Sequence, residues 1–167
     1  MERKPPKIVR PADVDGAGRW FTQRLNPRSR FRGAWLSRLG GLSRVAVDHV
    51  TLPPGAESFA LHAHHLEEEW LYILRGHPTL LTEEGDVALA PGDFVAMPAP
   101  QRAHNLANRT DEDVAYLVGG EPGLPFDVLD YPSLQKSYLL TRVPGQPTGF
   151  RALGPVENPF GPVDEEK

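Results

Sequence analysis

The sequence contains no cysteine and only two methionines among its 167 residues. Without cysteine the protein cannot form disulfides, iron–sulfur clusters or zinc ribbons, and it cannot use a thiolate nucleophile. It also lacks any run of about 18–20 consecutive apolar residues, the length that a membrane-spanning helix needs. The charged N-terminal residues lead into no apolar segment of the signal-peptide type. We therefore expect a cytoplasmic protein with no membrane partner.

A strong excess of positive charge is missing as well. The chain has 18 basic and 22 acidic residues and a net charge of −4, which argues against a dedicated nucleic-acid-binding protein. Basic residues do gather early in the chain, at Arg24, Arg28, Arg30, Arg32, Arg38 and Arg44. We interpret this cluster as a solvated segment on an acidic body, the alternative being a patch that binds an anion or nucleic acid.

Proline and glycine, in contrast, are abundant. The 18 prolines and 16 glycines are too many for a helical bundle, because each interrupts a helix or a central strand. Short runs rich in β-branched residues alternate with turn signals and predict an all-β sandwich or barrel. The predicted strands are 45–52, 58–64, 71–74, 78–82, 87–89, 94–97, 104–107 and 114–118.

The chain divides into three predicted parts within one domain. Residues 1–44 are expected to form an N-terminal arm followed by an aromatic packing and dimerisation segment over 20–44. Residues 45–140 form the barrel, in which 126–140 can dock as an edge strand. Residues 141–167 are a proline-rich acidic tail, weakly ordered from 144 on. Because open sheets leave edges that need cover, we expect a homodimer.

The segment with the clearest chemistry runs from His62 to Trp70. Side chains two residues apart project from the same face of a strand, so His62 and His64 present two imidazoles side by side. Glu69 completes the set if the chain turns after His65 and re-enters an antiparallel strand. Imidazole and carboxylate ligands together suit Zn, Mn, Fe, Ni or Cu.

A further ligand is expected about forty residues downstream, at His104. The two segments then contain, in order, Gly55, His62, His64, Glu69 and Gly76, and Gly92, Pro98, His104 and Asn108. This order resembles the paired motifs of the cupin superfamily. The resemblance covers about residues 45–140, and the run Asp130-Tyr131-Pro132 is similar to a bacterial group of small single-domain cupins.

The resemblance implies a double-stranded β-helix, a jelly-roll barrel. It implies one divalent metal ion (Fe, Mn, Ni or Zn) inside this barrel, with His62, His64, Glu69 and His104 as ligands. It further implies turn glycines at Gly76 and Gly92 and a loop-shaping role for Asn108. Two positions depart from the family pattern: Pro100 replaces a glycine, and His104 comes one residue late, so the loop before it must present the imidazole differently.

The other residues around these motifs are assigned as follows. His65 is expected to face outward, and His49 and His77 to lie at the surface or at strand ends. Glu67 and Glu68 are expected in a solvated turn, the alternative being that one is a hydrogen-bond partner of a ligand histidine. The predicted apolar wall of the site is Leu71, Ile73, Phe94 and Met97. Possible polar groups at its mouth are Tyr72, Gln101 and Arg102.

Four ligands on an octahedral metal leave about two positions open, enough for a bidentate substrate or for substrate and dioxygen. The first functional hypothesis is therefore a metal-dependent enzyme, acting on a small oxygenated metabolite by dioxygenation, isomerisation or hydrolysis. No residue can be named as catalytic beyond the ligands, which keeps a second hypothesis open: a non-catalytic module that binds or senses a sugar or small metabolite. A purely structural barrel fits worst, because it would bury a chelating set without need.

Overall fold

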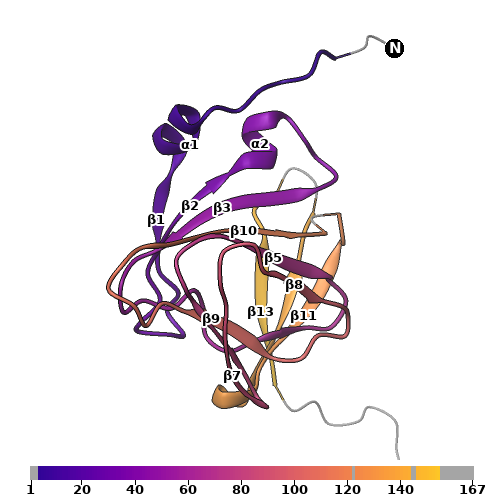
Figure 1. Ribbon diagram of the computed structural model, residues 1–167. Coiled ribbons are helices and arrows are strands. Elements are labelled where there is room, and N and C mark those ends of the chain that lie inside the picture. The colour runs from indigo at the N-terminus through magenta and orange to yellow at the C-terminus, as the bar shows by residue number, and fades with distance from the viewer. Residues whose placement is uncertain (1–3, 122, 144–145, 155–167) are drawn as a thin grey trace, which may run out of the picture.

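The computed structural model describes residues 4–121, 123–143 and 146–154, and in these it is built mainly from strands (Figure 1). The helices are α1 (Pro11–Ala17), α2 (Leu36–Gly40) and the short 3-10 helix η1 (Pro132–Leu134). The first strands are β1 (Arg19–Phe21), β2 (Phe31–Trp35), β3 (Ala46–Leu52), β4 (Ala63–His64), β5 (Glu69–Arg75), β6 (Thr79–Thr82) and β7 (Gly85–Ala88). The remaining strands are β8 (Phe94–Met97), β9 (His104–Ala107), β10 (Val114–Gly120), β11 (Phe126–Tyr131), β12 (Lys136–Thr141) and β13 (Gly149–Leu153).

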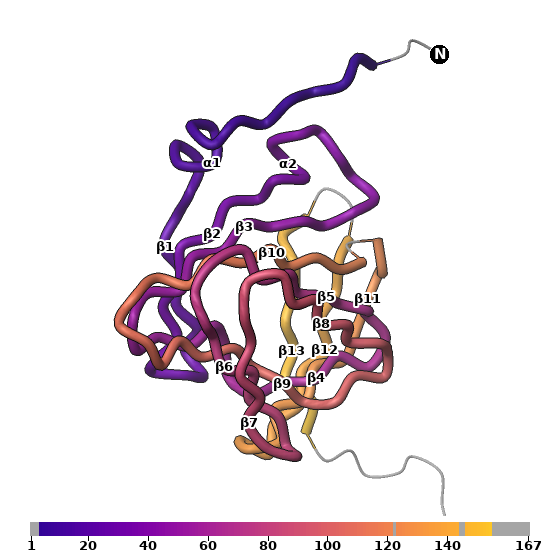
Figure 2. Tube along the Cα trace, viewed as in Figure 1, coloured from indigo at the N-terminus to yellow at the C-terminus, as the bar shows by residue number. Residues whose placement is uncertain are grey.

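These strands form three sheets whose named pairs are all antiparallel. The largest sheet has the order β1-β2-β3-β10-β5-β8, the second β13-β12-β11-β4 and the third β7-β6-β9. The chain path in Figure 2 shows the second and third sheets below and beside the largest one, so that the strands wrap around a common interior. The fold is a double-stranded β-helix barrel, which confirms the all-β prediction.

The interior follows from the alternation of side chains along each strand. In β3, Val50 and Leu52 point inward, and Leu52 is completely buried. Aliphatic and aromatic side chains from the neighbouring strands complete this core. Its other buried members are Phe31, Ala56, Leu71, Ile73, Leu89, Met97, Leu106, Val114 and Tyr116.

Two motif residues shape the connections as the resemblance implied. Gly76 follows β5 with φ 79°, and a Cβ there would lie 2.9 Å from a methyl of Val114, so a side chain at this position would be both strained and crowded. Asn108 is buried after β9 and donates its Nδ2 hydrogens to the carbonyls of Leu52 and Glu112 at 2.9 and 2.7 Å. Asn108 thereby fixes the loop that leads into β10.

The N-terminal region is more regular than the sequence suggested. The expected arm contains α1, and the aromatic segment forms the β1–β2 pair and α2. β2 pairs with β3, so this segment extends the largest sheet. Figure 1 shows both helices at one end of the molecule. A homodimer through residues 20–44 concerns a partner chain and stays a prediction.

The C-terminal region also extends a sheet. β12 pairs with both β11 and β13, so residues 149–153 form a strand where a weakly ordered tail was expected. Residues 144–145 and 155–167 of that predicted tail lie outside the described residues. In the part of the chain that the structure describes, no helix has the length and apolar character needed to cross a membrane.

Candidate metal centre

Strand pairing brings the four predicted ligands to one place inside the barrel. His62 and His104 face each other as an isolated antiparallel bridge, with backbone N–H···O bonds of 3.1 and 2.8 Å in the two directions. His64 lies in β4, two residues after His62, and Glu69 begins β5. The loop after Pro98 therefore presents His104 beside His62, although the spacing departs from the family pattern.

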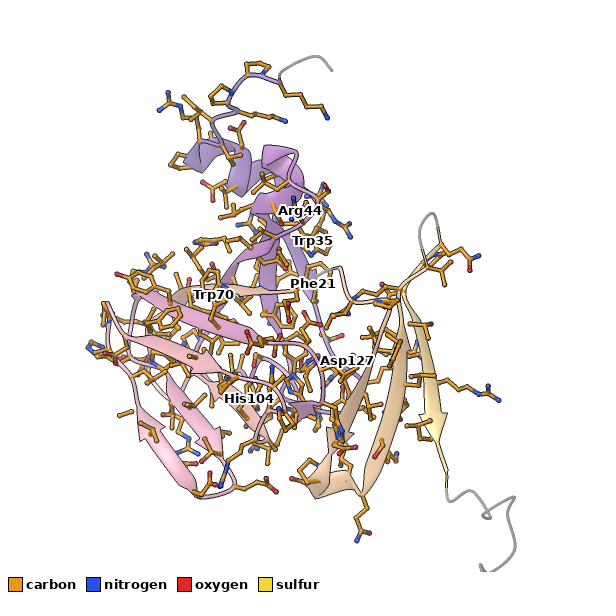
Figure 3. The ribbon with its side chains drawn as sticks, turned by 90° about the vertical axis from the view of Figure 1, so that its right-hand side faces the viewer. Phe21, Trp35, Arg44, Trp70, His104 and Asp127 are labelled. Atoms are coloured by element: carbon orange, nitrogen blue, oxygen red, sulfur yellow. The ribbon has the colours of Figure 1, made fainter. Side chains whose placement is uncertain are left out.

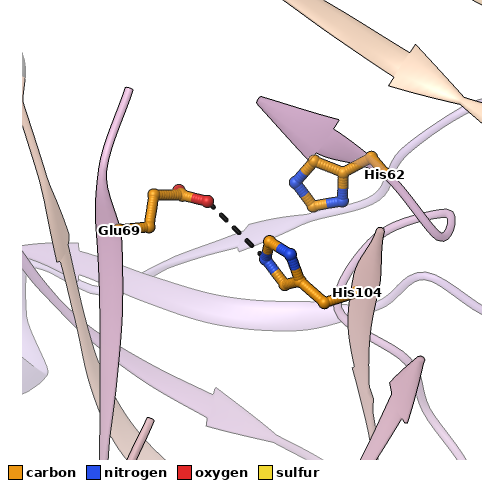
Figure 4. A group of neighbouring side chains, drawn as sticks. All are labelled: His62, Glu69 and His104. Carbon is orange, nitrogen blue, oxygen red and sulfur yellow. Dashed lines mark ion pairs between the residues drawn. The ribbon is translucent and has the colours of Figure 1, made fainter. Parts of the chain in front are cut away.

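Side-chain distances show how closely the four residues approach. The Oε2 atom of Glu69 lies 3.6 Å from Nε2 of His64 and 3.6 Å from Nε2 of His104. His62, Glu69 and His104 each offer a ligand atom within 4.8 Å of the others, and Figure 4 shows these three side chains converging. The ring centres of His62 and His64 are 5.3 Å apart. His62, Glu69 and His104 thus form one group of nitrogen and oxygen donors, and His64 approaches this group through its contact with Glu69.

The other nitrogen of each imidazole already has an acceptor. His62 Nδ1 lies 3.0 Å from the carbonyl oxygen of Ala60, and His104 Nδ1 lies 3.3 Å from that of Arg102. His64 Nδ1 lies 2.6 Å from Oδ2 of Asp127. An Nδ1–H that donates to these oxygens leaves each Nε2 lone pair free, the form in which histidine binds a metal.

Burial keeps the imidazoles of His62 and His104 neutral near pH 7. It lowers the pKa of His62 to about 3, with further lowering by His104 and His64. Burial likewise lowers the pKa of His104 to about 4. Because a metal binds neutral imidazole, no proton has to be displaced from either ring near neutral pH. His62 and His104 are therefore in the protonation state that a divalent ion requires, whereas burial raises the pKa of the Glu69 carboxyl.

Asp127 is the residue of this centre that the sequence did not reveal. It lies in β11, is fully buried, and accepts hydrogen bonds from His64 and from the backbone amides of Leu66 and Val128. Burial alone would raise the pKa of Asp127, but these hydrogen bonds outweigh burial and lower it. Asp127 is thus an anion that orients His64. Figure 3 shows Asp127 and His104 in the body of the molecule, between the barrel strands and the C-terminal strands.

The prediction that Glu67 lies in a solvated turn is wrong, because Glu67 is buried. Its Oε2 lies 2.5 Å from Nη2 of Arg142 and 3.9 Å from Nδ1 of His64. His64, Glu67 and Asp127 form a second group of the kind that could hold a metal. The short contact between His64 and Asp127 is a hydrogen bond, and Glu67 is engaged by a guanidinium, so we interpret this group as the support of His64. His65 faces outward as expected, pairing with Asp130 at 2.6 Å.

The pocket beside the ligands has a volume of about 100 Å³. Leu71 and Met97 line it as predicted, but Ile73 does not, and Phe94 stacks on Trp70 outside the barrel with 61% of its surface exposed. Of the three predicted mouth residues, Tyr72 and Arg102 are exposed. Gln101 is buried and donates from Nε2 to the backbone oxygen of Glu67 at 2.8 Å.

Asp48 is a second residue that the predictions missed. The strand register Asp48↔Val118↔Leu71 places it on the inward face, the same face as Glu69, which lies two residues before Leu71. It lines the pocket of the ligands. Burial raises the pKa of Asp48 to about 6, although the positive charge of Arg38 opposes this. The sequence did carry a signal, because Asp48 stands in register with Val50 and Leu52.

A substitution at Asp127 tests the orientation of His64. We expect Asp127→Asn to weaken metal affinity about 10–100-fold, because the amide has no negative charge to hold the imidazole in its tautomer. Metal titration of the apoprotein would measure this effect. Asp130→Asn is the matched control, since Asp130 pairs at the same distance with the exposed His65. Equal affinities of the two variants would contradict the assigned role of Asp127.

Comparison with known proteins agrees with this architecture. The family model of the cupin domain matches residues 48–120. A candidate sugar phosphate isomerase from Acidithiobacillus ferrooxidans is 30% identical over 90% of this chain and 97% of its own, with a TM-score of 0.77. A sugar phosphate isomerase of the cupin superfamily from Silicibacter pomeroyi is 28% identical, over 81% of this chain and 85% of its own, with a TM-score of 0.70.

More distant structures share the fold. A predicted oxalate decarboxylase from Thermotoga maritima is 22% identical, over 69% of this chain and 98% of its own, with a TM-score of 0.59. No curated protein matches the chain. The barrel with inward imidazoles defines the class of protein as a double-stranded β-helix with groups able to hold a metal. The chain belongs to the cupin superfamily.

Proposed function

We propose that this protein is a metal-dependent isomerase of a small sugar phosphate. In this proposal His62, His64, Glu69 and His104 hold one divalent metal ion. The observation that carries the proposal is the approach of His62, Glu69 and His104 to one another, with His64 3.6 Å from Glu69, and the presence of an acceptor at Nδ1 of each imidazole. Two similar solved structures, at 30% and 28% identity, are named as sugar phosphate isomerases, one of them as a candidate.

A divalent ion in this position supplies a Lewis acid for the carbonyl and hydroxyl oxygens of a substrate. The chain has to supply the proton transfer. Isomerisation of an aldose to a ketose moves one proton from C2 to C1 and a second from the hydroxyl oxygen on C2 to the carbonyl oxygen on C1, so the step balances without an oxidant. Asp48 faces the pocket from β3, and an ionised Oδ can accept the proton from one carbon and return it to the next.

Other residues of the pocket surround the ligands with apolar surface and a hydrogen-bond donor. Leu71, Met97 and Val118 form apolar wall around the ligands. Burial raises the pKa of Tyr116, whose hydroxyl therefore stays protonated and able to donate a hydrogen bond. An apolar site of this kind strengthens the interaction of a substrate with the few charged groups that remain.

The test combines metal content with isotope exchange. The protein, purified without a histidine tag, would be loaded separately with Fe, Mn, Ni and Zn and incubated in D₂O with aldose and ketose phosphates of five and six carbons. We expect metal-dependent interconversion, with deuterium entering beside the carbonyl, detected by NMR. A metallated protein that causes neither interconversion nor exchange with any of them would overturn the proposal in favour of a binding module.

A further inference from the structure

A second pocket lies beside the candidate metal centre and has a different character. Its volume is about 520 Å³, and it is lined by residues of α2, of the connection from α2 to β3, and of more distant segments. Four charged residues line it: Arg38 from α2, Asp48 from β3, Glu67 from the connection between β4 and β5, and Arg142 directly after β12. Asp48 lines the pocket of the metal centre as well.

Arg142 has an unused donor. Its Nη2 donates to Oε2 of Glu67 at 2.5 Å, but its Nη1 is buried without any hydrogen-bond partner in the described part of the chain. A buried guanidinium nitrogen without an acceptor is costly, and such groups usually mark the place of a missing partner. An anionic oxygen is the strongest partner for it.

Arg38 provides a second positive charge at the same pocket. Its guanidinium carbon lies 5.2 Å from the ring centre of Trp35, so the aromatic face supports the planar group. Arg38 is exposed, and among residues 4–121, 123–143 and 146–154 it takes part in no ion pair. A guanidinium stacked on an aromatic ring keeps its N–H edge available for a phosphate oxygen.

We propose that this pocket binds the phosphate group of the substrate, through Arg38 and Arg142, while the sugar end reaches the metal centre past Asp48. The inference rests on the proposed function and names the part of the site that recognises the substrate. The shared position of Asp48 supports it, because a ligand that occupies both pockets passes this carboxyl. β3 and β5 are separated by one strand, so Asp48 and Glu69 lie on strands about 10 Å apart, and both side chains line the pocket of the metal centre.

Isothermal titration of the metal-loaded full chain with inorganic phosphate and with ribose 5-phosphate tests this inference. We expect both probes to bind, and we expect Arg38→Gln and Arg142→Gln each to weaken the affinity at least tenfold, with the metal content of Arg38→Gln unchanged. Arg109→Gln is the control, because Arg109 pairs with Asp86 at the surface and does not line the pocket. Arg38 is exposed, so Arg38→Gln keeps the test valid even if Arg142→Gln, which leaves Glu67 buried without its partner, does not fold.

Two results would overturn the inference. One is phosphate affinity that is unchanged in Arg38→Gln and in folded Arg142→Gln. The other is binding of acetate as tight as that of phosphate, which would show a general anion site. Isomerase activity combined with unchanged phosphate affinity would refute this pocket and leave the proposed function standing. Arginine-dependent phosphate binding without isomerase activity would refute the proposed function and support the pocket.

Discussion

The His104→Ala substitution is expected to lower the metal content of the purified protein from about one equivalent to less than about a tenth. His104 supplies one of four converging donors, and its Nε2 lies 3.6 Å from Oε2 of Glu69. With one imidazole removed, the remaining three donors leave the ion open to exchange with solvent. Elemental analysis after dialysis would measure the loss, and circular dichroism would show that the barrel still folds.

His65→Ala is the control for this experiment. His65 is adjacent to His64 in the sequence, but its side chain is 48% exposed and pairs with Asp130. We expect this variant to keep its metal. If His104→Ala retains a full equivalent, or if both variants lose metal equally, His104 is not a ligand.

The Asp48→Asn substitution should reduce isomerase turnover about 10²–10⁴-fold and leave the metal content unchanged. An amide cannot accept the proton that isomerisation moves. In the unsubstituted protein the rate should fall as the pH drops through about 6, because burial raises the pKa of Asp48 to this value and protonation removes the base. The charged groups that face Asp48 across its two pockets are Arg38, Glu67, Glu69 and Arg142, with His62 and His104 neutral near pH 7.

The raised pKa of Asp48 can also be tested by a stability measurement, which does not depend on enzymatic activity. The folded-state pKa lies above the ordinary value of 3.8, so the carboxyl favours the folded state when protonated, and this contribution is lost as the pH rises through about 6. Asp48→Asn should therefore raise the melting temperature relative to the unsubstituted protein more at pH 8 than at pH 4.5. After allowance for solvent screening of this partly exposed group, the difference is of order 1 kcal/mol, or about 2–4 °C. Asp111→Asn, at an exposed position, is the control and should show no such trend.

Turnover of Asp48→Asn within about threefold of the unsubstituted protein would rule out Asp48 as the proton-transfer group. An isomerase rate that does not change between pH 5 and 8 would also contradict this assignment. Loss of metal in Asp48→Asn would instead indicate that Asp48 supports the ligands.

The local part of the site could be predicted because strand geometry is local. His62 and His64 share a face by alternation, and the turn to Glu69 takes only five residues. His104 was named as the candidate for a further ligand and by resemblance to a family, but strand alternation could not pair it with His62, because that pairing depends on the closure of the barrel. No spacing rule connects Asp127 with His64 or Arg142 with Glu67, which are 63 and 75 residues apart in the sequence.

Strand alternation could have corrected one prediction, at Phe94, and could have revealed one residue that was not predicted, Asp48. Phe94 and Met97 are three residues apart in one strand and cannot both face inward, and the structure places Met97 inside and Phe94 outside. Asp48 stands two residues before Val50 and four before Leu52, so the inward face of β3 included a carboxyl from the start. A carboxyl at Asp48, on the same face of the strand as the apolar Val50 and Leu52, was therefore a sequence signal for the pocket of the metal centre.

The position of β4 sets a limit on how far the chain can be shortened while its proposed ligands stay in position. β4 pairs with β11, which carries Asp127, and Arg142 follows β12 in the same sheet. The region that matches the cupin family model ends at residue 120, before both of these residues. A protein cut at that boundary would contain every proposed ligand, yet His64 would have neither its backbone partner strand nor its carboxylate. We therefore expect the smallest unit that holds the four side chains in position to include the sheet β13-β12-β11-β4, which residues 48–120 alone do not complete.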